Sequence, residues 1–156
     1  MILSGENHRR SGKLMKIIIG SDHAGFDLKE EIKAFLETEL GHEVKDVGVF
    51  NKDSADYPVM AQKVAGAITE EKFPFGILIC GTGIGMSIVA NRYKGVRAAL
   101  CHNILTARLS RQHNDANILA MGGRIIGVSL AQEMVREFLT TSFEGGRHKR
   151  RIDQID

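Results

Sequence analysis

The sequence has few of the residues that build disulfide or metal frameworks. Its 156 residues include no tryptophan, two prolines and two cysteines, Cys80 and Cys101. Two cysteines are too few for a disulfide scaffold, and we find no group of residues with the spacing of a structural metal site. Free cysteines are the rule in reducing compartments, so the sequence predicts a cytoplasmic protein.

An excess of charge of one sign is also lacking. The chain has 21 lysines and arginines against 19 aspartates and glutamates, a formal net charge of +2. This balance gives no support to a nucleic-acid or membrane-surface partner. No apolar stretch approaches the length of a membrane span. We therefore expect neither a nucleic-acid nor a membrane partner.

Composition and length favour one compact domain. Hydrophobic residues make up 43% of the chain and charged residues 26%, which is the range of globular proteins. Residues 1–14 are polar and lack the apolar segment of a signal peptide. We expect residues 1–14 to form a disordered extension and residues 15–156 to form a single domain.

Short apolar runs alternate with amphipathic segments along the rest of the chain. Such alternation predicts an α/β fold, in which a parallel sheet of five strands carries helices on both faces. The strands are expected at 16–20, 44–47, 75–79, 96–100 and 118–121, and the helices at 27–40, from Pro58 onward, and at 84–93, 103–111 and 129–140.

The carboxyl ends of parallel strands meet at one edge of a sheet, where α/β proteins bind their ligands. Three glycines, Gly81, Gly83 and Gly85, follow the third expected strand. A dinucleotide-binding loop needs a further glycine where Met86 stands, and a phosphate-binding P-loop needs a Gly-Lys-Ser/Thr ending that is absent. The remaining interpretation is a turn that binds an anion but no nucleotide. The alternative is a turn whose glycines serve only for packing.

Cys80 ends the same strand, directly before the glycine turn. A free cysteine is most often a small buried hydrophobe, which is the interpretation we give to Cys101. Beside a helix N-terminus and free amides, however, a thiolate is favoured over a thiol, and Cys80 is a candidate base or nucleophile. Asp22 and His23 follow the first strand at this edge, where Asp22 could instead cap a helix. His113 belongs to a polar cluster at the opposite edge, where a solvated loop is the simpler interpretation.

A run of basic residues lies near the C-terminus, from Arg147 to Arg151. A solvated tail is its simplest interpretation, and a nucleic-acid patch would need more basic surface with interleaved aromatic residues. If the run is helical, Arg147 and Arg151 share one face, because they are four residues apart. Two guanidinium groups on one face could clamp a phosphate.

Five motifs follow one another along the chain: Gly-Ser-Asp-His-Ala-Gly at 20–25, Asp-Tyr-Pro at 56–58, Cys-Gly-Thr-Gly-Ile-Gly at 80–85, Arg-Gln-His-Asn-Asp at 111–115 and Gly-Gly-Arg-His at 145–148. Together they resemble the type B ribose-5-phosphate isomerases, which form one sugar-phosphate isomerase family with the galactose-6-phosphate isomerase subunits. The resemblance covers residues 15 to about 152. It implies a Rossmann-like, three-layer α/β/α fold and a homodimer or tetramer whose active site lies at the subunit interface.

The resemblance also implies residue roles. Cys80 is the base that removes the C2 proton of the open-chain aldose, Thr82 positions a sugar hydroxyl, and His113 helps to open the furanose ring and donates a proton. A second branch of the family replaces the cysteine with a glutamate after the third glycine, where this chain has Met86. The residues implied to bind substrate are Asp22, His23, Tyr57, Gly81, Gly83, Ile84, Gly85, His102, Asn114, Arg124, Arg147 and Arg151.

The activity implied by the resemblance is a metal-independent, cofactor-free interconversion of ribose 5-phosphate and ribulose 5-phosphate through an enediolate, as in the pentose phosphate pathway. Such a proton transfer needs a base, an oxyanion site and a phosphate anchor. Two alternatives stay open. One is an isomerase of a hexose 6-phosphate, either allose or galactose 6-phosphate, and the other is a non-catalytic module that senses a phosphosugar or a nucleotide.

Overall fold

The computed structural model describes residues 13–156. The expected extension at residues 1–14 therefore lies outside the described residues, apart from its last two, Lys13 and Leu14, which are exposed and have no regular structure. The core of the molecule is a five-stranded, all-parallel sheet with the strand order β2-β1-β3-β5-β4. Its strands are β1 (Lys16–Ser21), β2 (Glu43–Asp46), β3 (Phe75–Cys80), β4 (Ala98–Leu100) and β5 (Ile118–Gly122).

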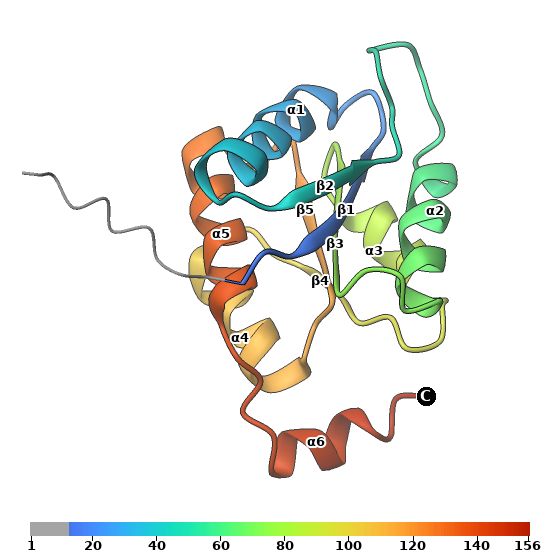
Figure 1. Cartoon of the computed structure of the whole chain (residues 1–156). Coiled ribbons are helices and arrows are strands. Elements are labelled where there is room, and N and C mark those ends of the chain that lie inside the picture. The colour runs from blue at the N-terminus through green and yellow to red at the C-terminus, as the bar shows by residue number, and fades with distance from the viewer. Residues whose placement is uncertain (1–12) are drawn as a thin grey trace, which may run out of the picture.

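Helices cover both faces of this sheet, which confirms the predicted α/β class (Figure 1). One face carries α1, α4 and α5, and the other carries α2 and α3. The helices are α1 (Phe26–Ala34), which continues as the π-helical turn η1 (Phe35–Glu39), α2 (Tyr57–Thr69), α3 (Ile84–Ala90), α4 (Ile104–Asn114), α5 (Val128–Thr140) and α6 (Arg147–Ile152).

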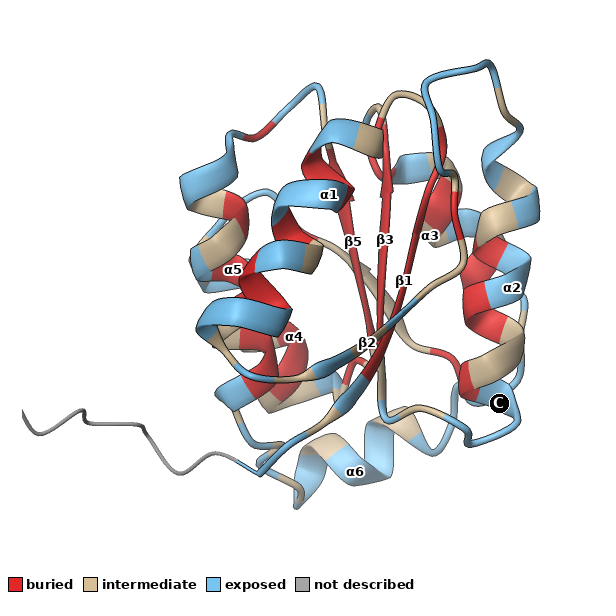
Figure 2. Ribbon diagram, turned by 45° about the horizontal axis from the view of Figure 1, so that its top comes forward, coloured by how far each residue is buried: buried red, intermediate tan, exposed pale blue. Residues whose placement is uncertain are grey.

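Each face of the sheet has its own apolar core because side chains alternate along a strand. In β1, Ile17 and Ile19 pack under α1 and α5, whereas Ile18 packs under α2. The buried residues of the helices all turn toward the sheet, and α6 remains outside this core (Figure 2). No helix in the described part of the chain combines the length and the apolar character that a bilayer crossing requires.

Four element boundaries differ from the expectation by more than one residue. The helix expected at 27–40 changes to a π-helical turn at Phe35, α3 ends at Ala90, and β4 begins at Ala98. The fourth difference concerns the site, because α4 extends to Asn114 and includes most of the polar cluster that was expected to form a loop. The buried Arg111 stabilises this longer end by donating to the Asp115 carboxylate (2.8 Å) and to the carbonyl of Ala116 (2.6 Å).

The strand order places a topological switch point between the carboxyl ends of β1 and β3. These strands are neighbours in the sheet, but the chain leaves β1 for α1 on one face and leaves β3 for α3 on the other. Open α/β sheets bind ligands in the crevice at such a switch point.

Candidate active site

Cys80 lies at this switch point, as the last residue of β3. It is 5% exposed, and its Sγ accepts a hydrogen bond of 3.0 Å from the backbone N–H of Gly83. Gly83 has a φ of +80°, and a Cβ there would lie 2.7 Å from Leu100 and 2.9 Å from the backbone of Met121. A glycine is therefore required at the position whose amide donates to the sulfur.

Two further predicted residues lie against the glycine turn. A Cβ at Gly81 would lie 3.5 Å from Nη1 of Arg124, and a Cβ at Gly85 would lie 2.5 Å from the ring of Tyr57. The N–H of Arg124 donates to the carbonyl of Gly81 at 3.0 Å, which fixes the start of the arginine side chain. The structure therefore brings a guanidinium group from the loop after β5 and a phenol ring from the first turn of α2 to the glycine turn.

Thr82 occupies the exposed tip of the turn. Its Oγ1 accepts a hydrogen bond of 3.2 Å from the N–H of Ile84, and the Ile84 side chain is 49% exposed. The hydroxyl can still donate its own proton, because the amide uses only an acceptor position. Thr82 is thus placed to bind a hydroxyl of a ligand above the turn.

Asp22 and His23 follow β1 on the other side of the crevice. The buried Asp22 accepts a bond of 3.0 Å from the N–H of Gly25, so it closes the loop before α1 and is not the N-cap residue of that helix. His23 Nδ1 accepts from the N–H of Ala55 at 3.1 Å. A neutral His23 must therefore carry its proton on Nε2, which makes that nitrogen a donor.

His102 lies apart from this group. It is exposed after β4, and β5 stands between β4 and β3. Burial raises the pKa of the preceding Cys101 thiol, although hydrogen bonding with Thr106 and Ser110 opposes the shift. Cys101 is thus held as a neutral, packed thiol, in line with its expected role as a small hydrophobe.

His113 and Asn114 form the last turn of α4, at the other end of the sheet. The His113 ring stacks on the ring of His148, with centroids 4.4 Å apart and planes at 12°. Its Nε2 lies 3.6 Å from the carboxylate of Glu144. Glu144 was missed at the sequence level, and its position directly before the Gly145-Gly146 pair was the signal that could have drawn attention to it.

The basic run does form a helix, α6, which begins at Arg147. Arg147 and Arg151 are therefore one helical turn apart, and both are exposed. The pKa of His148, between them, is lowered by loss of solvation and by the positive charges of His113 and Arg147. Two guanidinium groups and two imidazoles thus gather around the end of α4.

The predicted site residues fall into two groups at opposite edges of the sheet. Cys80, Asp22, His23, Tyr57, Arg124 and the glycine turn lie at the carboxyl edge, whereas His113, Asn114, Arg147 and Arg151 lie at the amino edge. The amino edge is marked by Gly76, the second residue of β3, whose N–H donates to Asn117, three residues after Asn114. The two groups are thus separated by about the length of a six-residue strand, roughly 17 Å.

A buried ion pair beside the first group was also missed. Lys29 of α1 has a fully buried side chain, and its Nζ lies 2.6 Å from Oδ2 of Asp46 at the end of β2. The other oxygen of Asp46 accepts from the N–H of Gly48 at 2.9 Å. The pair therefore fixes the start of the loop that later presents Ala55 to His23.

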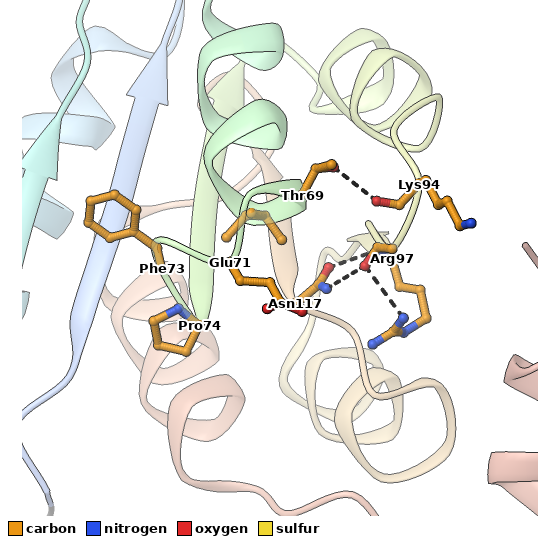
Figure 3. A pocket seen from close by; sticks show the side chains of 9 residues that line it. Thr69, Glu71, Phe73, Pro74, Lys94, Arg97 and Asn117 are labelled. Atoms are coloured by element: carbon orange, nitrogen blue, oxygen red, sulfur yellow. Dashed lines mark hydrogen bonds between the residues drawn. The ribbon is translucent and has the colours of Figure 1, made fainter.

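A hollow of about 520 Å³ contains none of the predicted site residues. It opens at the amino edge between α2 and β4, where Phe73, Pro74, Lys94 and Arg97 line it (Figure 3). Asn117 accepts from the N–H of Arg97 at 2.8 Å beside it. Because Arg97 also bonds the carbonyls of Asn114 and Asp115, this arginine supports the end of α4 and is not free for a ligand.

Comparison with known proteins places the chain among sugar isomerases. A family model described as "Ribose/Galactose Isomerase" matches residues 17–155. Ribose-5-phosphate isomerase B of Escherichia coli is 48% identical, over 91% of this chain and 95% of the relative. The crystal structure of a ribose 5-phosphate isomerase from Thermotoga maritima is 55% identical, with a TM-score of 0.89 over 91% of this chain and 97% of that one. A 4-deoxy-4-sulfo-D-erythrose isomerase of a Clostridium species is 47% identical, over 83% of this chain and 81% of the relative.

Proposed function

Since the chain belongs to the ribose/galactose isomerase family, we propose that it interconverts ribose 5-phosphate and ribulose 5-phosphate. The observation that carries the proposal is the thiol of Cys80, which lies at the switch point with an amide N–H aimed at its sulfur. Met86, at the position where the other branch of the family has its glutamate, is fully buried and apolar. Cys80 is therefore the base that this crevice offers.

The reaction moves one proton from C2 to C1 and another from O2 to O1. Cys80 Sγ takes the proton from C2 of the open-chain aldose, and the C1 carbonyl becomes an enediolate oxygen. The O2 proton then passes to O1, and a proton returned to C1 leaves the C2 carbonyl of the ketose. In this proposal the amides of the glycine turn stabilise the enediolate charge. Preorganised donors of this kind supply a large part of enzymatic rate enhancement.

The remaining roles are divided between the two edges of the sheet. Thr82 and Asp22 bind sugar hydroxyls at the carboxyl edge. His113 opens the furanose ring, and Arg147 and Arg151 bind the phosphate from the amino edge. Because about 17 Å separates the edges within one chain, the complete site requires a homodimer or larger assembly in which one subunit supplies α6 to the crevice of the other. A free thiolate base also requires a reducing compartment such as the cytoplasm.

The test compares two cysteine variants. We expect Cys80→Ala to lower kcat for ribose 5-phosphate by at least about a hundredfold, because general acid–base groups contribute about that much or more. Cys101→Ala is the matched control and should keep near-normal kcat, since this thiol lies in the core after β4. With substrate that carries deuterium at C2, the loss of deuterium to solvent measures removal of the C2 proton directly. A Cys80→Ala protein that retains kcat and deuterium exchange would refute the assignment.

The Clostridium relative favours a second candidate substrate, a sulfonated tetrose. A sulfonate carries one negative charge and can be held by the same arginine pair. The four substrates to compare by kcat/KM in EDTA are ribose 5-phosphate, allose 6-phosphate, galactose 6-phosphate and 4-deoxy-4-sulfo-D-erythrose. We expect ribose 5-phosphate to be the preferred substrate. Saturable binding of these sugars without turnover would instead identify a sensing module.

A further inference from the structure

A mixed cluster of metal-ligating side chains lies at the amino edge of the sheet. His113 of α4, His148 of α6 and Glu144 from the segment between α5 and α6 each offer one ligand atom, and these three atoms lie within 4.8 Å of one another. His113 Nε2 and Glu144 Oε1 are 3.6 Å apart. The three side chains come from different parts of the chain and converge on one point.

We propose that His113, Glu144 and His148 bind one transition-metal cation of the Zn²⁺ class, and that the bound cation inhibits the isomerase. Binding stands on the geometry alone. Inhibition rests on the proposed function, because His113 is the ring-opening group there. The metal is an inhibitor in this proposal and takes no part in the proton transfer.

The three donor atoms are of the types that zinc prefers. Two imidazole nitrogens and one carboxylate oxygen form a common three-ligand set for Zn²⁺, with water in the fourth position. Imidazole also suits Cu²⁺ and Ni²⁺, whereas Mg²⁺ and Ca²⁺ prefer oxygen ligands. Arg147, directly before His148, repels any cation, so only metals that gain strongly from imidazole bonding can bind here.

The distances require only a small adjustment of exposed side chains. Zinc lies about 2.0–2.2 Å from each ligand, so the ligand atoms of a tetrahedral site stand roughly 3.3 Å apart. The His113–Glu144 separation of 3.6 Å is already close to this value. These two side chains are 40% and 46% exposed and can rotate, and the nearly parallel imidazoles must turn so that their nitrogens converge.

A metal bound at this cluster would block the proposed reaction in two ways. It would occupy a nitrogen of His113 that ring opening needs as a proton donor or acceptor. It would also lie beside Arg147, within the region proposed to hold the phosphate. Inhibition should therefore weaken as the concentration of ribose 5-phosphate rises.

Direct metal binding is measured first, on full-length protein from which any affinity tag has been removed. After EDTA treatment and buffer exchange, Zn²⁺ is titrated by calorimetry and Co²⁺ by its visible absorption spectrum. We expect one ion per chain. Glu144→Gln and His148→Gln should each weaken binding by at least about tenfold, because each removes one of three ligands. Glu133→Gln, a matched change on α5 at an exposed carboxylate, should leave binding unchanged.

The competing explanation is a metal bound to the Cys80 thiolate. Cys80→Ser should bind Zn²⁺ as the unchanged protein does, and the Co²⁺ spectrum should lack a thiolate charge-transfer band. If binding is lost in Cys80→Ser and retained in Glu144→Gln and His148→Gln, the proposal is overturned. The proposal is also overturned if Zn²⁺ binds to none of these proteins, or to all of them with equal affinity.

The inhibition is measured separately, so that its failure and that of the proposed function can be distinguished. Zn²⁺ should inhibit the unchanged enzyme, and Glu144→Gln should need at least about tenfold more Zn²⁺, in line with its weaker binding. The metal-free rate of Glu144→Gln is measured first, and its inhibition by Zn²⁺ is expressed relative to that rate. A chain that binds Zn²⁺ at this cluster but isomerises none of the sugars supports the metal site and refutes the proposed function. Equal inhibition of both proteins overturns the inhibitory role.

Discussion

At the scale of single residues, the glycine turn places two constraints on one position of the backbone. At Gly83 a positive φ coincides with close packing on Leu100 and Met121, and the same residue directs its amide at Cys80. Gly95 also has a positive φ, of +78°, but nothing lies within 4 Å of a Cβ placed there. The two glycines therefore separate the effect of backbone strain from the effect of crowding.

We predict that Gly83→Ala lowers the free energy of unfolding by about 2 to 5 kcal/mol, the sum of left-handed strain and overpacking. Gly95→Ala should lower it by about 1 to 2 kcal/mol, because only the strain applies. Urea unfolding of both variants provides the measurement. Equal losses in the two variants would contradict the view that the turn is crowded at Gly83.

A histidine far from the site gives a prediction for pH. His42 Nδ1 accepts from the N–H of Met15 at 3.2 Å, and burial lowers its pKa from 6.5. As the pH falls, the His42 imidazole is therefore protonated at a higher pH in the unfolded chain than in the folded chain. The stability contributed by the neutral ring is fully present above pH 6.5 and is lost as the pH falls through the folded pKa.

The unfolding midpoint measured between pH 7.5 and 5 tests this assignment. We expect His42→Gln to lose less stability on acidification than the unchanged protein, because the variant has no imidazole to protonate at this position. His102→Gln is the control, since that histidine is exposed. Identical pH dependence of the unchanged protein and His42→Gln would rule out the role of His42.

At the scale of elements, α1 and β2 are joined by the buried Lys29–Asp46 pair. Removing one partner of a buried ion pair typically costs about 3 to 5 kcal/mol. Asp46→Asn leaves Lys29 with the half-exposed Glu30 carboxylate at 3.0 Å, so we predict a loss at the lower end of that range, about 3 kcal/mol. Lys33→Met removes a partly exposed lysine 3.5 Å from the same carboxylate, and it should cost less than about 1 kcal/mol. Chemical unfolding of both variants checks the prediction, and similar losses would contradict it.

The elements also show which parts of the fold a sequence can predict. The strands β1, β3 and β5 were predicted almost to the residue, because they are apolar runs that end at polar residues or glycines. The end of α4 was not, because Arg111–Asn114 is polar and the helix closes at Asp115, which has a φ of +46° in place of the usual glycine. Arg111 stabilises this end by bonding the Asp115 carboxylate and the Ala116 carbonyl, and hydrophobic periodicity does not register such polar contacts.

At the scale of the whole molecule, the candidate site could be assembled only in part from the sequence. The motifs identified the residues around Cys80, and the strand order places Asp22 and His23 beside them as expected. The location of α6 depends on how the chain turns after α5, at Gly145 and Gly146, and composition does not determine that turn. Glu144 became visible only because α6 folds back onto α4.

The separation of the two edges leads to a prediction about mixed subunits. We expect Cys80→Ala and His113→Gln proteins each to have very low activity, because each damages every site of its homodimer. When the two are refolded together, half of the dimers are mixed, and each mixed dimer holds one intact site, which gives about a quarter of normal activity. Mixtures that stay as inactive as the separate variants would show that the site is not shared between subunits.

The same division between the two edges has an evolutionary consequence. If each site takes its crevice from one copy and its α6 from the other, a duplicated gene can distribute the two halves between its products. One product could then lose Cys80 and the other His113, and their heterodimer would retain one working centre. The vacant centre would be free of selection for turnover, so it could acquire a new ligand while the enzyme stayed active.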